Sequence, residues 1–229
     1  MATPVLLPGN MCDERLWTAE VRSALPGCVD AALTRDATID AMAARVLSSV
    51  EGPIVPVGFS MGGIVALAMA RAAPERVAAM VLLDTNPAAD LPERAAARPR
   101  QQADVRDGAL ERIVVEELKP NYLAAANRTD AALLSLLRDM AMGLGEEVFV
   151  RQSEALRTRP DQSGVLAALD APVLIACGAE DRLCPPAWHD AMASAARRAT
   201  LHVVPGAGHM LPIEQPARLA AILTAWRTA

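Results

Sequence analysis

The feature that most constrains this chain is the alternation of short apolar runs with segments of helical periodicity. Apolar runs of this length are typical of buried strands. They cover residues 4–7, 54–58, 77–83, 172–177 and 200–204, with a shorter candidate at 28–33. Residues 39–50, 64–73, 186–195 and 219–226 show the helical spacing instead. Because strands that alternate with helices pack as a parallel sheet between helices, the sequence predicts an α/β fold with a mostly parallel sheet covered on both faces.

A long stretch in the middle of the chain interrupts this alternation. Residues 87–164 show only helical spacing, for example at Leu133, Leu137 and Met140, with charged residues between the apolar ones. A chain of 229 residues has the length of one domain that carries an insertion. We therefore interpret 87–164 as an inserted helical cap, and 1–86 together with 165–229 as the core.

Charge and composition exclude several classes of function. The net charge is −5 and no basic block occurs, which argues against nucleic acid as a partner. No apolar stretch approaches the roughly 18 residues that span a bilayer, and the start of the chain lacks a signal-peptide pattern. The four cysteines form no metal-binding or disulfide pattern. We expect a cytoplasmic protein without a membrane partner, and no pattern defines an oligomer.

A candidate nucleophile lies where the second long apolar run meets a helix. Residues 58–62 read Gly-Phe-Ser-Met-Gly, which matches G-x-S-x-G. In that motif the serine occupies a tight strand-to-helix turn, and the glycines leave room for the neighbouring backbone. Ser60 would then lie at a helix N-terminus, whose partial positive charge favours developing negative charge. Pro56 is unexpected in such a strand, because it cannot donate a ladder hydrogen bond.

A serine hydroxyl needs a base to accept its proton, and the chain has three histidines. His189 falls in a predicted helix and His202 in a predicted strand, where structural or exposed roles are expected. His209 lies in the sequence Gly-Ala-Gly-His, a glycine-rich loop that directly follows the last predicted strand. This loop can carry an imidazole over the carboxyl edge of the sheet, so His209 is the predicted base.

The base needs a carboxylate that orients it and stabilises its protonated form. Asp181 follows the strand that ends near Gly178 and therefore lies at the same edge of the sheet. Asp84, which follows another strand, and Glu180 are alternatives. A simpler interpretation of Asp181 is a capping or surface carboxylate paired with Arg182.

Ester chemistry also needs two backbone N–H donors for an oxyanion. Met61, the residue after the serine, is one candidate donor. The loop after the first strand supplies the other, with Asn10 as the first choice and Met11 as the second.

With these residues in view, the chain resembles the α/β-hydrolase superfamily. The matching pieces are Leu-Pro-Gly-Asn at 7–10, Gly-Phe-Ser-Met-Gly-Gly at 58–63, Gly-Ala-Glu-Asp at 178–181 and Gly-Ala-Gly-His at 206–209. Their order along the chain is the order that this fold uses. The resemblance is strongest to small bacterial capped carboxylesterases of the pimeloyl-carrier-protein methyl esterase type, and it extends to enol-lactonases and menaquinone-pathway lyases. Pro8-Gly9 stands where the superfamily usually has His-Gly.

The resemblance implies an acyl-transfer mechanism on a small or medium ester, without a cofactor or a metal. Lactone or C–C bond cleavage on the same triad is an alternative, and so is a non-catalytic binding role. Within the cap, Arg151, Arg157 and Arg159 are candidates for binding a carboxylate, although solvated helix charges explain them more simply. Cys12 and Cys184 fall near the predicted site, where small packing residues are the simpler interpretation.

Overall fold

The computed structural model describes residues 2–118 and 121–228. The ends of the predicted core, residues 1 and 229, and residues 119–120 of the predicted cap lie outside the described part. The strands form one six-stranded parallel sheet in the order β2-β1-β3-β4-β5-β6. The strands are β1 Thr3–Leu7, β2 Val29–Asp30, β3 Ile54–Phe59, β4 Met80–Leu83, β5 Val173–Gly178 and β6 Ala199–Val204. The predicted parallel sheet is confirmed.

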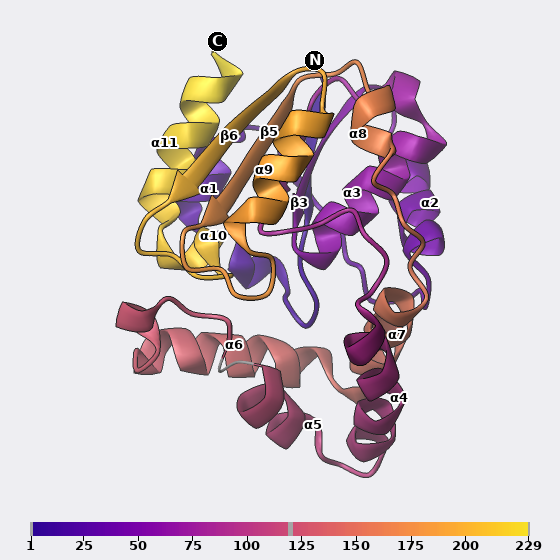
Figure 1. Ribbon diagram of the computed structural model, residues 1–229, viewed down its shortest axis with the longest axis vertical. Helices are drawn as coiled ribbons and strands as arrows, with labels where there is room; N and C mark the ends of the chain where they lie inside the picture. The colour runs from indigo at the N-terminus through magenta and orange to yellow at the C-terminus, as the bar shows by residue number, and fades with distance from the viewer. Residues whose placement is uncertain (1, 119–120, 229) are drawn as a thin grey trace.

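Helices cover both faces of this sheet, as Figure 1 shows. The helices of the sheet region are α1 Ala19–Ser23, α2 Ile39–Ser49, α3 Met61–Ala72, α8 Val165–Ala168, α9 Pro186–Ala195, α10 Leu211–Glu214 and α11 Pro216–Arg227, with short 3₁₀ turns at Glu14–Leu16 and Pro74–Arg76. Helices α2, α3, α8 and α9 pack in one apolar cluster, and α1 and α11 pack in another on the opposite face.

The two clusters follow from the two-residue period of a strand. In β1, the side chains of Val5 and Leu7 join the cluster of α2 and α3, while Leu6 between them joins the cluster of α1 and α11. All three are completely buried. A strand that is buried on both faces reads as an unbroken apolar run, which is why the sequence pattern located the central strands β1, β3, β4 and β5.

The strand order reverses direction at β1. The chain passes from β1 to β2 at one edge and then returns to β3 on the other side of β1. The loops that follow β1 and β3 therefore leave the sheet in opposite directions at its carboxyl edge. In open parallel sheets, ligands bind in the crevice at such a reversal point.

Pro56 sits in β3 at a break in the ladder to β4. The N–H of Ala78 donates to the Ile54 carbonyl at 2.9 Å, and Ile54 pairs with Val77. In a parallel ladder the next bond would come from the N–H of residue 56, which proline lacks. The pairing resumes only at Val57 with Val81, so the β4 side holds one more residue than the β3 side. This bulge accommodates the proline, which sequence alone did not explain.

The regular elements described between residues 92 and 157 are all helical. They are α4 Pro92–Arg106, α5 Leu110–Arg112, a π-helical segment at Ile113–Leu118, a 3₁₀ turn at Ala125–Asn127, α6 Ala131–Leu144 and α7 Glu146–Arg157. In Figure 1 these helices lie across the end of the sheet where the strands finish. All of them except the 3₁₀ turn share an apolar cluster that includes Ile113 and Phe149, and Met11 of the loop after β1 packs into it.

Candidate active site

Ser60 occupies the turn between β3 and α3 in a strained backbone conformation. Its φ is 51° and its ψ is −116°, a combination that a residue with a side chain adopts only when its surroundings enforce it. The backbone contacts that enforce it leave no space for side chains nearby. A Cβ on Gly58 would lie 2.4 Å from the Gly62 carbonyl oxygen, and one on Gly62 would lie 2.0 Å from the Leu7 carbonyl oxygen. The turn thus depends on both glycines of the motif.

His209 is held in the loop after β6 by contacts with the helical region above the sheet. Its N–H donates to the Tyr122 carbonyl at 2.7 Å. The preceding Gly208 approaches residue 124 so closely that a Cβ would meet its nitrogen at 2.6 Å. The imidazole packs near two aromatic rings, with centroids 5.3 Å from Phe59 and 5.8 Å from Tyr122. These contacts fix both the position and the tilt of the ring.

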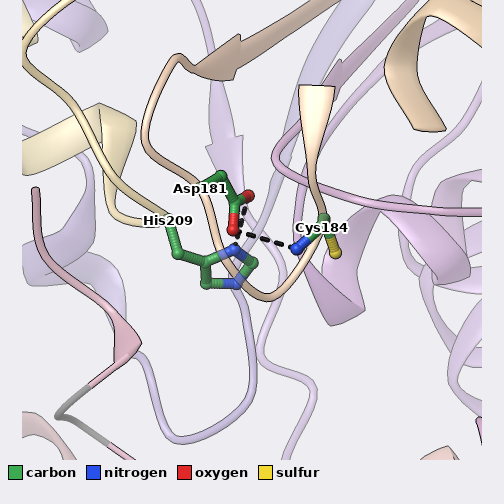
Figure 2. A group of neighbouring side chains, drawn as sticks. All are labelled: Asp181, Cys184 and His209. Carbon is green, nitrogen blue, oxygen red and sulfur yellow. Dashed lines mark hydrogen bonds and ion pairs between the residues drawn. The ribbon is translucent and has the colours of Figure 1, made fainter. Parts of the chain in front are cut away.

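The structure brings Ser60, His209 and Asp181 into one hydrogen-bonded line. The Ser60 Oγ lies 3.0 Å from His209 Nε2, and His209 Nδ1 lies 2.8 Å from Asp181 Oδ2. The other oxygen of Asp181 accepts the N–H groups of Leu183 and Cys184 at 2.8 and 2.9 Å. Figure 2 shows the carboxylate between the imidazole and the Cys184 nitrogen. In this geometry a proton can pass from the hydroxyl to the imidazole while the carboxylate holds the ring.

Asp181 stays ionised in spite of its burial. Burial alone would raise the pKa of Asp181, but the neighbouring His209 and the hydrogen bonds from His209 and two amides hold that pKa below its usual value. A carboxylate with a lowered pKa remains a negative partner for an imidazolium, which is the condition that proton transfer from Ser60 requires.

The alternative acids have other partners. Asp84 is completely buried, and its Oδ1 accepts the Gly178 N–H at 2.9 Å. Burial and the negative charge of Asp181 raise the pKa of Asp84 well above its usual value. Glu180 instead accepts the Ala125 N–H at 2.8 Å. Neither Asp84 nor Glu180 makes a hydrogen bond to His209 among the contacts described.

Neither of the other two histidines makes a hydrogen bond to the Ser60 hydroxyl among the described contacts. His189, in α9, is completely buried, and its Nε2 accepts the Thr85 N–H at 3.1 Å. Burial lowers the pKa of His189, which matches a neutral ring that accepts a hydrogen bond. His202 lies in β6 and is partly exposed.

The two candidate donors after β1 differ in their partners. The Met11 N–H donates to Gln152 Oε1 of α7 at 2.8 Å, so this amide is already engaged. Within the described residues, no acceptor takes the backbone N–H of Asn10 or of Met61. Both residues line the cavity that contains Ser60. Gln152 also accepts from the Asn10 side chain at 3.1 Å and donates to the Leu33 carbonyl at 2.8 Å.

A cavity of about 410 Å³ opens above Ser60 and His209, between the sheet and the helices from residue 92 onward. Cys12 and Cys184 line it, as their sequence positions suggested. Burial raises the pKa of Cys12 to about 12, so its thiol remains protonated. Four arginines also line the cavity: Arg94, Arg98, Arg159 and Arg182. The sequence singled out only Arg159 of these, because nothing in the pattern of a charged helix tells which side faces a cleft.

The other two arginines suggested by the sequence point elsewhere. Arg157 pairs with Glu154 at 2.6 Å, and Arg151 binds the Thr34 carbonyl at 2.9 Å and pairs with Glu147 at 3.2 Å. Neither lines the cavity.

Asp181, Cys184 and His209 offer donor atoms within 4.8 Å of one another, a spacing that a metal ion could use. These atoms are already engaged differently. His209 Nδ1 and Asp181 Oδ2 bind each other, and burial raises the pKa of the Cys184 thiol well above its usual value. A metal would have to break the first contact and deprotonate the thiol. The arrangement therefore suits a proton relay better than a metal site.

The chain belongs to the alpha/beta hydrolase family, whose model matches residues 5–222. It is 26% identical to a pimeloyl-[acyl-carrier protein] methyl ester esterase of Methylococcus capsulatus over 87% of this chain and 80% of that protein. It is 49% identical to the lipase LipV of Mycobacterium tuberculosis over 25% of this chain, a segment that spans only 22% of the lipase. The expected resemblance to this group of esterases is confirmed.

A solved structure extends the likeness to the whole fold. The malate-bound thermophilic esterase of Thermogutta terrifontis is 28% identical and superimposes with a TM-score of 0.89, over 100% of this chain and 90% of that one. Among the described residues, every helix is too short or too polar to cross a bilayer.

Proposed function

We propose that the protein is a carboxylic ester hydrolase in which Ser60 is the nucleophile, His209 the general base and Asp181 the carboxylate that orients His209. The observation that carries this proposal is the continuous line of hydrogen bonds, 3.0 Å from Ser60 Oγ to His209 Nε2 and 2.8 Å from His209 Nδ1 to Asp181 Oδ2. The esterase names of the relatives support the same class of substrate.

The reaction would proceed in two halves. Ser60 Oγ attacks the ester carbonyl while His209 Nε2 takes the hydroxyl proton, and the tetrahedral intermediate collapses when His209 returns that proton to the leaving alcohol. Water then attacks the acyl-serine with His209 again as base, which releases the acid and restores Ser60. Asp181 remains a carboxylate throughout, since its lowered pKa favours the ionised form.

The amides of Asn10 and Met61 are proposed to hold the oxyanion. Both have no other acceptor among the described residues and line the cavity beside Ser60. Met61 begins α3, so its N–H carries the partial positive charge of a helix N-terminus. Met11, the second choice from the sequence, is less suited because Gln152 already binds its N–H.

We propose further that residues 87–164 act as a cap over a core of residues 1–86 and 165–229. Helix α4 and the residues near Tyr122 line the cavity opposite Ser60, so they would contact the part of the substrate that does not react. A cavity of about 410 Å³ suits a small or medium acyl group better than a long lipid chain.

The experiment is a panel of 4-nitrophenyl esters from acetate to decanoate, tested beside lactones, with the wild-type protein and Ser60→Ala. We expect ester hydrolysis that is fastest for the shorter acyl chains. In Ser60→Ala it should fall by about 10⁴-fold or more while the melting temperature is kept. A wild-type protein that opens lactones but no ester would replace the proposed reaction by lactone hydrolysis. Wild-type rates in Ser60→Ala would refute the nucleophile.

A further inference from the structure

The lining of the cavity carries an excess of positive charge, although the chain as a whole has a net charge of −5. Four arginines line the cavity, against the carboxylates of Asp90 and Glu117. Asp84 and Asp181 are not among the residues that line the cavity. Burial and the charge of Asp181 raise the pKa of Asp84, and Asp181 pairs with His209.

Two of the arginines share one carboxylate. Arg98 Nε lies 2.7 Å from one oxygen of Asp90, and Arg159 Nη1 lies 2.9 Å from the other. The Asp90 side chain is only 1% exposed, so water has little access to this carboxylate. Burial and the nearby positive charge of Arg98 lower the pKa of Arg159. One carboxylate between two guanidinium groups leaves one positive charge uncompensated.

The second carboxylate that lines the cavity, Glu117, pairs with arginines that do not line it. Glu117 pairs with Arg100 at 2.7 Å and with Arg112 at 3.0 Å. It therefore does not offset the charge of the arginines that face the cavity.

Arg94 is the arginine most available to a ligand. It lies in the first turn of α4, it is only partly exposed, and no carboxylate pairs with it among the described residues. Its described contact is one long bond of 3.3 Å from Nη2 to the Leu183 carbonyl, which leaves most of its five N–H donors free. Leu183 follows Asp181 by two residues, so this contact ties the first turn of α4 to the loop that carries Asp181. Arg182 also lacks a carboxylate, but it is exposed and water screens its charge.

We infer that the preferred esters of this site carry a second, anionic group, a carboxylate at the far end of the acyl chain. Arg94 binds this carboxylate, and the uncompensated positive charge of the Arg98–Asp90–Arg159 cluster supports the binding. This inference rests on the proposed function and adds the class of substrate to it. Arginine presents paired N–H donors that match the two oxygens of a carboxylate. A neutral acyl chain would leave the guanidinium without a partner.

The test compares two esters of nearly equal shape. Monomethyl adipate carries a terminal carboxylate, whereas methyl 6-oxoheptanoate carries an acetyl group in its place. Monomethyl esters from succinate to suberate then vary the distance between the two groups. Methanol release gives kcat/KM for the wild-type protein and for Arg94→Gln, Arg94→Lys and Arg106→Gln. Arg106 lies in the same helix, is exposed and does not line the cavity, so it controls for the loss of one charge.

In the wild-type protein, kcat/KM for the best anionic ester should exceed that of its neutral counterpart by about tenfold or more. Arg94→Gln should lower this ratio by about tenfold, Arg94→Lys should restore part of it, and Arg106→Gln should keep it within about twofold. A wild-type preference for the neutral ester at every chain length would overturn the inference. An unchanged ratio in Arg94→Gln would overturn it as well.

A binding measurement separates this inference from the proposed reaction. Calorimetric titration of Ser60→Ala, with and without Arg94→Gln, measures the affinity for monomethyl adipate without turnover. Weaker binding by about tenfold in the double variant supports the anionic subsite even if the wild-type protein hydrolyses no ester, a result that would refute only the proposed function. Equal binding by the two variants refutes the subsite even if ester hydrolysis is found.

Discussion

The two sides of the cavity are held in place by different kinds of contact. On the sheet side, the loops that carry Ser60 and His209 touch neighbouring backbone so closely that glycine is required at Gly62, beside Leu7, and at Gly178, beside Gly208. On the helical side, Arg98 and Arg159 are held by ion pairs with Asp90. Backbone contacts allow almost no variation, while side-chain pairs can be exchanged without moving the sheet. We infer that the reacting groups are fixed by the fold, and that the helical side is where substrate preference is set.

The largest effect is expected from a side chain at a backbone contact. Gly62→Ala would place a Cβ 2.0 Å from the Leu7 carbonyl oxygen, so β1 and α3 must move apart. We expect a loss of about 3 kcal/mol or more in unfolding free energy, together with the loss of esterase activity. Thermal unfolding and ester hydrolysis measure both.

Gly164→Ala is the matched control for this substitution. A Cβ on Gly164 meets nothing within 4 Å, and its φ of −76° suits any residue. We expect a change within about 0.5 kcal/mol. A Gly62→Ala protein as stable as Gly164→Ala would mean that the sheet side is less rigid than its contacts suggest.

The next effect concerns Asp181, the carboxylate proposed to orient His209. Asp181→Asn replaces an acceptor by a group that can donate, so His209 would turn or change its tautomer, and kcat should fall by about 10³- to 10⁴-fold. Asp84→Asn should stay within about tenfold of the wild type, because Asp84 binds the Gly178 N–H rather than His209. Steady-state kinetics with 4-nitrophenyl butyrate compares the two variants. A larger loss in Asp84→Asn would reverse their roles.

A moderate effect is expected where the two sides of the cavity meet. Gln152 of α7 is 1% exposed and binds the Met11 N–H, the Asn10 side chain and the Leu33 carbonyl. Gln152→Leu removes these contacts and frees the loop that holds the Asn10 amide. We expect kcat to fall by about 10- to 100-fold with a smaller change in KM.

Gln152→Glu keeps an acceptor for the Met11 N–H and should recover part of the lost kcat. If Gln152→Leu changes only the melting temperature, the glutamine has a structural role alone, and the helical side does not influence the reacting groups.

The smallest effect is a pH-dependent change in stability. The pKa of Asp84 is raised in the folded protein by burial and by the charge of Asp181. The folded state thus holds this proton more tightly than the unfolded state does. The stability that Asp84 contributes is present at low pH and is lost as the pH rises through the raised pKa.

Asp84→Asn removes this titration. The melting temperature of the variant minus that of the wild type should therefore be a few degrees higher at pH 8 than at pH 5. Thermal melts at the two pH values measure the difference. A difference that does not depend on pH would show that Asp84 has an ordinary pKa in the folded protein.

The sequence predicted the site residues on the sheet side of the cavity, but it did not predict which side chains of the helical side face the cavity. Ser60, Asp181 and His209 each follow a strand that the apolar pattern located, and parallel strands end at one edge of a sheet, so the sequence predicted that they would meet. The exposed and buried sides of α4 could not be predicted, because this helix has few apolar residues and its orientation depends on docking to residues such as Leu183. Arg94 was therefore missed, and Arg157 was suggested although it pairs with Glu154.

The identity of the nucleophile can be tested most directly by covalent labelling with diethyl 4-nitrophenyl phosphate. Mass spectrometry of the digested protein should find one diethylphosphate on the peptide that contains Ser60, and none in Ser60→Ala. In His209→Gln the labelling should slow by at least about 10³-fold, since the hydroxyl has lost the base 3.0 Å away. A label on another residue, or labelling of His209→Gln at the wild-type rate, would contradict the account.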